Sequence, residues 1–166
     1  MNRTLRLTMM AVFVAIGVLG SQFLWFPTGI AKAYPVQHAV NVISAVILGP
    51  IPAVIIAFVI GLLRNLLGIG TILAFPGGMI GALFAGYLYH WTKKKLLAGV
   101  GEIIGTGVIG ALLCVPIANI IMGTPAGIIA FLPGFLVSSI TGAIIGMLIL
   151  SKVKHTSIVR QPASPK

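Results

Sequence analysis

The sequence predicts an all-α integral membrane protein in which six transmembrane helices form one bundle and both termini face the cytoplasm. Of the 166 residues, 58% are hydrophobic and only 7% are charged, whereas soluble domains are about 45–50% apolar and about 25% charged. A helix that crosses a bilayer needs about 20 apolar residues. Six such helices joined by short loops therefore account for the length of the chain.

We place the six spans by dividing the apolar sequence at its Pro and Gly clusters and at its charges. The expected ranges are 5–24, 36–48, 51–67, 78–91, 96–122 and 127–150. The second and fourth ranges are short for a complete crossing, which tilt, kinking or burial inside the bundle can accommodate. A topology with fewer complete crossings is the alternative.

The positions of the cations predict which side of the membrane each loop faces. With both termini in the cytoplasm, Lys32 and Arg64 fall toward the outside and the other nine Lys and Arg residues fall on the cytoplasmic side. Cytoplasmic loops carry an excess of Lys and Arg, so this bias supports an even number of spans. Because the cations sit at helix ends and tails, we interpret the net charge of +10 as a topology signal and expect no nucleic-acid binding.

The two ends of the chain need separate interpretation. The N-terminal segment could imitate a signal peptide, but residues 18–20 make a poor cleavage site, so we expect a true first helix. In this helix Ala11 and Ala15 form a small-residue stripe that suits a contact inside the bundle or with a separate membrane protein. Residues 1–151 are expected to form the membrane domain, and 152–166 a polar, disordered cytoplasmic tail.

Polar side chains on the second and third spans suggest a site. His38, Asn41 and Ser44 lie along one helix face, where they either bond neighbouring helices or, for His38 and Asn41, line a pocket near the outer surface. Arg64 and Asn65 end the third span, just before a glycine-rich loop. Arg64 either snorkels to the outer interface or, with Asn65, donates hydrogen bonds to a ligand.

Four further residues have two interpretations each. Glu102, the only acid, is expected near the cytoplasmic third of the fifth span, and there it needs a partner or a proton. It is either part of a structural ion pair or a deep ligand contact. Asn119 lies near the outer end of the same span, while Trp25 and Tyr34 flank the first outer loop. These aromatic residues form either an interfacial belt or the stacking walls of a pocket for a flat heterocycle.

Missing residue types exclude several functions. One acid, three His and one Cys cannot readily form a paired-carboxylate site or a zinc tetrad, so we expect neither catalysis nor a bound metal. The phosphate-binding motif G-x-x-x-x-G-K-S/T is absent, so ATP hydrolysis is not expected either. A single buried acid offers little for proton or sodium coupling. We therefore expect a binding protein without a cofactor of its own, whose uptake work a partner would supply.

Several motifs resemble one family over roughly residues 5–150. They are Ala11-x-x-x-Ala15, Pro35-x-x-His38-x-x-Asn41-Val42, Leu48-Gly49-Pro50, Leu63-Arg64-Asn65-Leu66-Leu67-Gly68-x-Gly70-Thr71, Leu73-Ala74-Phe75-Pro76-Gly77 and Gly101-Glu102-x-x-Gly105-Thr106-Gly107. The chain resembles the substrate-binding S components of energy-coupling factor (ECF) transporters, and within them the ThiW family.

The resemblance implies a six-helix S component in a prokaryotic plasma membrane. It would dock through Ala11 and Ala15 onto a membrane-embedded coupling protein, attached in turn to two cytoplasmic ATPases that use the ATP. The implied cargo is hydroxyethylthiazole, a neutral thiamine precursor. Hydrogen-bond donors suit this cargo, whereas a cationic vitamin would require carboxylates. The alternatives are another small vitamin or precursor as cargo, or a membrane assembly protein that transports nothing.

Overall fold

The computed structural model describes residues 1–28 and 31–153, and it confirms the all-α class. The elements are α1 (Arg3–Phe23), β1 (Phe26–Thr28), β2 (Ala31–Ala33), α2 (Pro35–Leu48), α3 (Pro50–Leu66), α4 (Ala74–Thr92), α5 (Lys95–Glu102), the π-helical η1 (Ile103–Gly110), α6 (Ala111–Pro116), the π-helical η2 (Ile117–Ile121) and α7 (Ile128–Lys152). Because α5, η1, α6 and η2 are continuous, the described residues form six helical segments, as the sequence predicts. Of the predicted tail, residues 154–166 lie outside the described residues.

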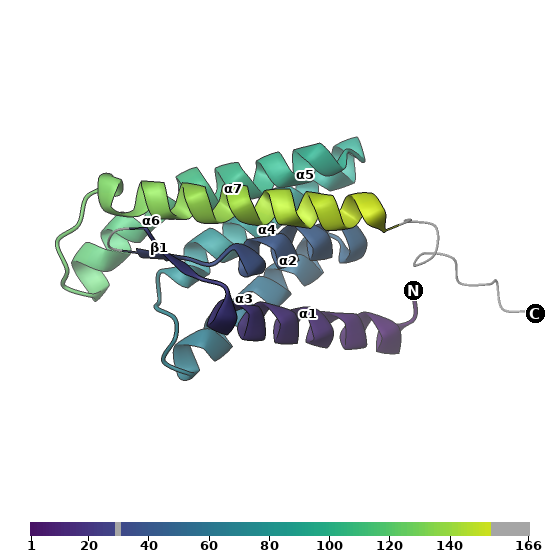
Figure 1. The fold of residues 1–166 in the computed structure, drawn as a ribbon, viewed down its shortest axis with the longest axis horizontal. Helices are drawn as coiled ribbons and strands as arrows, with labels where there is room; N and C mark the ends of the chain where they lie inside the picture. The colour runs from purple at the N-terminus through teal and green to yellow at the C-terminus, as the bar shows by residue number, and fades with distance from the viewer. Residues whose placement is uncertain (29–30, 154–166) are drawn as a thin grey trace, which may run out of the picture.

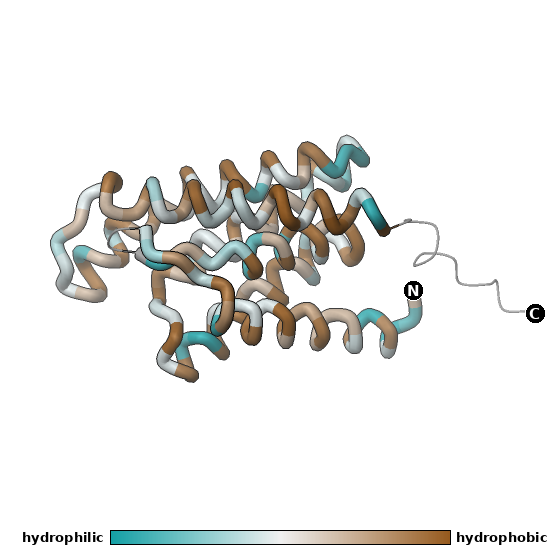
Figure 2. The backbone as a smooth tube through the Cα atoms, in the orientation of Figure 1, coloured by the Kyte–Doolittle hydropathy of each residue, from teal (hydrophilic) through white to brown (hydrophobic). Residues whose placement is uncertain are grey.

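The six helical segments differ in length. α1, the segment from α5 to η2 and α7 have 21, 27 and 25 residues, and each is long and apolar enough to cross a membrane. α2 and α3 have only 14 and 17 residues, or about 21 and 26 Å at 1.5 Å per residue. Six complete crossings therefore stay a prediction. The start of α1 and the end of α7 lie at the same end of the bundle (Figure 1), and hydrophobic residues run along the helices between hydrophilic ends (Figure 2).

The short helix α2 forms the centre of the bundle. Ten of its 14 residues are buried, because it contacts α1, α3, α4 and α7. α1 lies at the edge (Figure 1) and buries only Gly17, Val18 and Ser21. A helix enclosed by its neighbours need not match the bilayer thickness, since protein rather than lipid surrounds it.

Glycines bring the helices of the bundle into backbone contact. A Cβ at Gly105 of η1 would lie 2.8 Å from the Cα of Gly81 in α4. In α7, a Cβ at Gly142 would lie 2.5 Å from the Cβ of His38, and one at Gly146 would lie 3.1 Å from the carbonyl oxygen of Ala39 in α2. Small residues of this kind allow the close approach on which helix association in membranes depends.

Three local features differ from the sequence-based expectation. α4 begins at Ala74 and not near residue 78, because Pro76 lies in its first turn, where a missing N–H costs little. An antiparallel hairpin pairs Phe26 with Ala33 in the first loop. The fifth span contains π-helical turns, the second of which begins directly after Pro116, whose ring nitrogen cannot donate the usual helical hydrogen bond.

Candidate functional site

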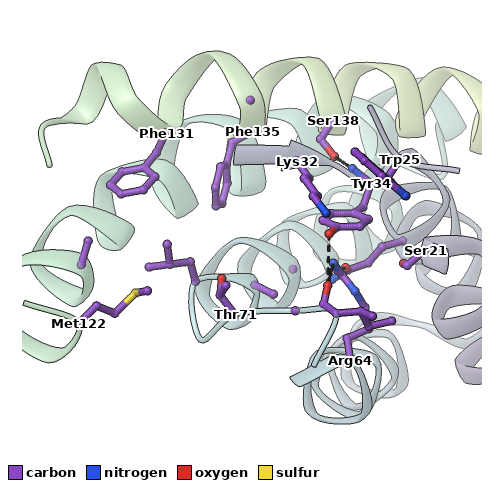
Figure 3. A pocket seen from close by; sticks show the side chains of 18 of the residues that line it. Ser21, Trp25, Lys32, Tyr34, Arg64, Thr71, Met122, Phe131, Phe135 and Ser138 are labelled. Atoms are coloured by element: carbon purple, nitrogen blue, oxygen red, sulfur yellow. Dashed lines mark hydrogen bonds between the residues drawn. The ribbon is translucent and has the colours of Figure 1, made fainter. Parts of the chain in front are cut away.

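A cavity of about 560 Å³ is lined by loop and helix-end residues at one end of the bundle, and this end lies opposite the N-terminus (Figure 1). Its walls come from the end of α1, the hairpin, the start of α2, the end of α3 with the following loop, the loop after η2 and the start of α7. Small-molecule pockets typically measure about 300–1,000 Å³. In Figure 3, Phe131, Phe135 and Met122 lie on one side of this cavity, and Lys32, Tyr34 and Arg64 lie on the other.

Arg64 organises the polar side of the cavity. Its Nη1 donates a hydrogen bond to Oε1 of Gln37, and its Nη2 lies 3.5 Å from the carbonyl oxygen of Ile69. Its guanidinium carbon lies 3.7 Å from the centre of the Tyr34 ring, in a cation–π contact. The residue is only 2% exposed, so these contacts hold the guanidinium in place and fix the shape of this wall.

Tyr34 ties the hairpin to the bundle. Its backbone N–H donates to Oγ of Ser138 in α7 at 2.7 Å, and its hydroxyl donates to the carbonyl oxygen of Ile69 at 3.2 Å. A second cation–π contact places the Lys32 ammonium 4.1 Å from the Trp25 ring. The hairpin therefore connects α7 to the loop between α3 and α4 across one wall of the cavity (Figure 3).

A buried carboxylate cluster lies behind the cavity wall. Oε1 of Glu102 lies 2.7 Å from Nδ1 of His38 and accepts a hydrogen bond from Nδ2 of Asn41 at 3.0 Å. The hydroxyl of Thr106 lies 2.9 Å from the same oxygen. Glu102 and Asn41 are both 0% exposed, whereas His38 also lines the cavity. A Cβ at Gly81 would lie 2.7 Å from Oε2 of Glu102, so this glycine makes room for the cluster.

The structure brings four of the eight predicted ligand residues to the cavity wall. They are Trp25, Tyr34, His38 and Arg64.

The other four predicted ligand residues do not line the cavity, and their side chains bond to protein groups. Asn41 and Glu102 belong to the buried cluster. Asn65 donates to the carbonyl oxygens of Gly61 and Thr71, and Asn119 exchanges two hydrogen bonds with the backbone of Ala126.

The expected separation in depth between His38 and Glu102 is wrong. Charge placement put His38 near the outer surface and Glu102 in the cytoplasmic third, yet the two side chains touch. The reason is the length of α2. The hairpin occupies the loop end of the bundle, and the 14 residues of α2 fill only the part between the hairpin and the turn at Gly49. His38 therefore lies deeper in the bundle than the charge placement predicts.

Several cavity residues are absent from the sequence-based prediction. Gln37 precedes His38 directly, and Phe131, Phe135 and Ser138 also line the cavity. The last three follow a spacing of four and then three residues, which places them on one helix face. This periodicity was the available signal, but it is hard to separate from ordinary packing in so apolar a helix.

The predicted docking residues lie away from the cavity. Ala11 and Ala15 are both exposed on α1. They are not internal contacts of this chain, which leaves the interpretation as a surface for lipid or for a separate protein.

A bundle of apolar helices around such a cavity defines a membrane protein that holds a small molecule. A family model described as thiamine-precursor transporter protein (ThiW) matches residues 7–156. The chain therefore belongs to the ThiW family, and it is a transport component for a thiamine precursor. The comparisons with curated proteins and with solved structures gave no significant match.

Proposed function

We propose that this chain is the substrate-binding S component of an ECF-type importer and that its substrate is hydroxyethylthiazole. The observation that carries the proposal is the composition of the cavity wall. Glu102 is the only acid in the chain, and it lies behind the wall and not in it. A cationic thiazolium such as that of thiamine would meet Arg64 and Lys32 without a countercharge, which is unfavourable.

The two sides of the cavity suit the two ends of this neutral heterocycle. Phe131 and Phe135 offer aromatic surface for stacking on a flat ring. The opposite side offers His38, Gln37 and hydroxyl groups for a ring nitrogen and an alcohol.

In this proposal the energy for uptake comes from other subunits. The chain binds its substrate at the outer face of the cell membrane and docks through Ala11 and Ala15 onto a membrane-embedded coupling protein. Two cytoplasmic ATPases bind and hydrolyse the ATP. The exposed position of both alanines on α1 supports this role, since small residues let a partner helix approach closely.

Calorimetry on the purified chain tests the substrate assignment. Hydroxyethylthiazole should bind with micromolar or higher affinity, and thiamine should bind at least about tenfold more weakly. Tighter binding of thiamine would reject the assignment. Proteoliposomes that contain this chain alone should accumulate no thiazole, and accumulation there would reject the dependence on a coupling module.

A further inference from the structure

We propose that His38 recognises the hydroxyl group of the substrate and that Glu102, behind the cavity wall, is the positioning residue that prepares His38 for this contact. The inference rests on the proposed function, because it assigns one end of hydroxyethylthiazole to one wall of the cavity. His38 is the residue that joins the two places: it lines the cavity and touches the buried carboxylate.

The contact with Glu102 fixes which ring nitrogen of His38 carries a hydrogen. An ionised carboxylate only accepts hydrogen bonds. Nδ1 of His38 lies 2.7 Å from Oε1 of Glu102, so Nδ1 carries the hydrogen and donates it. Carboxylates set the tautomer of histidines in metal sites in the same way. Nε2, the other ring nitrogen, has no hydrogen-bond partner among the described residues.

Charge balance makes Nε2 an acceptor. Among the buried side chains of the described residues, Arg64 is the one Lys or Arg and Glu102 the one acid. With both ionised, their charges cancel, and a second proton on His38 would leave an unbalanced buried charge, which is costly in an apolar interior. The imidazole is therefore neutral, and the lone pair of Nε2 is available to the cavity.

An acceptor at this position selects a hydroxyl group. The alcohol of hydroxyethylthiazole can donate a hydrogen bond to Nε2, whereas its ring nitrogen has no hydrogen to donate. A site built around such a bond rejects an analogue that lacks the hydroxyl, because the buried acceptor then stays unpaired.

Among the residues that contact the carboxylate, only His38 should lose its hydrogen-bond partner when the carboxylate is removed. Nδ2 of Asn41 also donates to the carbonyl oxygen of Gly78 at 3.0 Å, and the Thr106 hydroxyl also lies 2.9 Å from the carbonyl oxygen of Gly77. Both residues therefore keep a partner in Glu102→Met, a substitution that approximately conserves volume. Nδ1 of His38 loses its hydrogen bond to Glu102, and the ring is then free to turn or to change tautomer.

The experiment compares the binding of hydroxyethylthiazole with that of its 5-ethyl analogue, in which hydrogen replaces the hydroxyl. The wild-type protein should favour the alcohol by at least about tenfold. In Glu102→Met this ratio should fall to about threefold or less. Glu102→Gln, which keeps an acceptor oxygen, should preserve the preference. Thr106→Val is the matched control, because it removes a different bond to the same oxygen and should leave the ratio unchanged.

A second measurement needs no ligand. Nitrogen-15 spectra of protein labelled at its three histidines, with His38→Gln for assignment, should show His38 neutral with its hydrogen on Nδ1. A hydrogen on Nε2 overturns the proposal, as does an unchanged binding ratio in Glu102→Met. If the wild-type protein binds neither thiazole, the proposed function fails as well, so the two failures are distinguishable.

Discussion

Two polar clusters meet at neighbouring residues of α2, and they hold different parts of the molecule. Gln37 bonds to Arg64, and His38 bonds to Glu102. The Arg64 cluster joins α2 to Tyr34 and to the loop carbonyl of Ile69. The Glu102 cluster joins α2 to α5 and, through the carbonyl oxygens of Gly77 and Gly78, to α4. Arg64 thus connects α2 and α3 to the hairpin and to the loop after α3, whereas Glu102 connects helices to one another.

Substitutions in the two clusters should therefore affect different properties of the protein. Loops at the cavity are the part of a binding protein that is expected to move, since local stability there is lowest. Substitutions that remove contacts of the Arg64 cluster should mainly lower ligand affinity. Losses in the Glu102 cluster should appear mainly in the free energy of unfolding, with an additional effect on selectivity through His38.

The largest effect is expected from Gly81→Val, which tests the Glu102 cluster. A Cβ at this position would lie 2.1 Å from Oγ1 of Thr106 and 2.7 Å from Oε2 of Glu102. Overpacking of this kind should lower the free energy of unfolding by about 3 kcal/mol. Thermal unfolding in detergent measures the change. Gly127→Val, where nothing lies within 4 Å, is the control, and equal losses in both variants would contradict the placement of the cluster.

Arg64→Met should come second, with its effect on binding. The substitution keeps an aliphatic stem but removes the contacts to Gln37, Ile69 and Tyr34, so the wall loses its shape. We expect ligand affinity to fall about thirtyfold, or about 2 kcal/mol, and under the proposed function assembly with a coupling protein should be retained. Lys32→Met is the matched control: Lys32 is exposed, so its cation–π contact should contribute less than about 1 kcal/mol. Normal binding by Arg64→Met would mean that the site lies elsewhere.

Ser138→Ala should produce a smaller loss. Its hydroxyl accepts the backbone N–H of Tyr34, and the loss of one such bond costs about 1 kcal/mol. Affinity should fall about fivefold, as measured by calorimetry. In the neighbouring Ser139, the hydroxyl bonds within α7 to Leu136. Ser139→Ala should therefore bind almost normally, and an equal loss there would argue against an anchored hairpin.

The smallest effect on either cluster is expected from Ala11→Leu. Its side chain lies on the exposed face of α1, away from both clusters, so binding and unfolding should match the wild type. Under the proposed function, uptake by the complete transporter should nevertheless be lost, because the larger side chain blocks close helix contact. Val12→Leu, a change at another exposed position, should transport normally. Uptake that persists in Ala11→Leu would remove this face from the docking surface.

The helices could be predicted from sequence because long apolar runs are a strong signal. The hairpin could not, since three-residue strands with Pro27 and Lys32 show no clear alternation. Four of the cavity residues could be identified, His38 and Arg64 as polar groups within apolar spans, and Trp25 and Tyr34 as aromatic residues beside the first outer loop. The pairing of His38 with Glu102 could not, because it depends on how deeply a short helix sits, and span boundaries do not define depth.

The two ends of α7 have different roles, and this division affects how the range of substrates can change. Toward one end of the helix, Gly142 and Gly146 press against the backbone of α2. Toward the other end, Phe131 and Phe135 face the cavity. Because the glycines that bring α7 against α2 and the aromatic pair that lines the cavity occupy separate turns of one helix, evolution can exchange the aromatic pair for a new cargo while the contact between α7 and α2 is kept. Directed evolution of this transporter for other heterocycles would begin at those two positions.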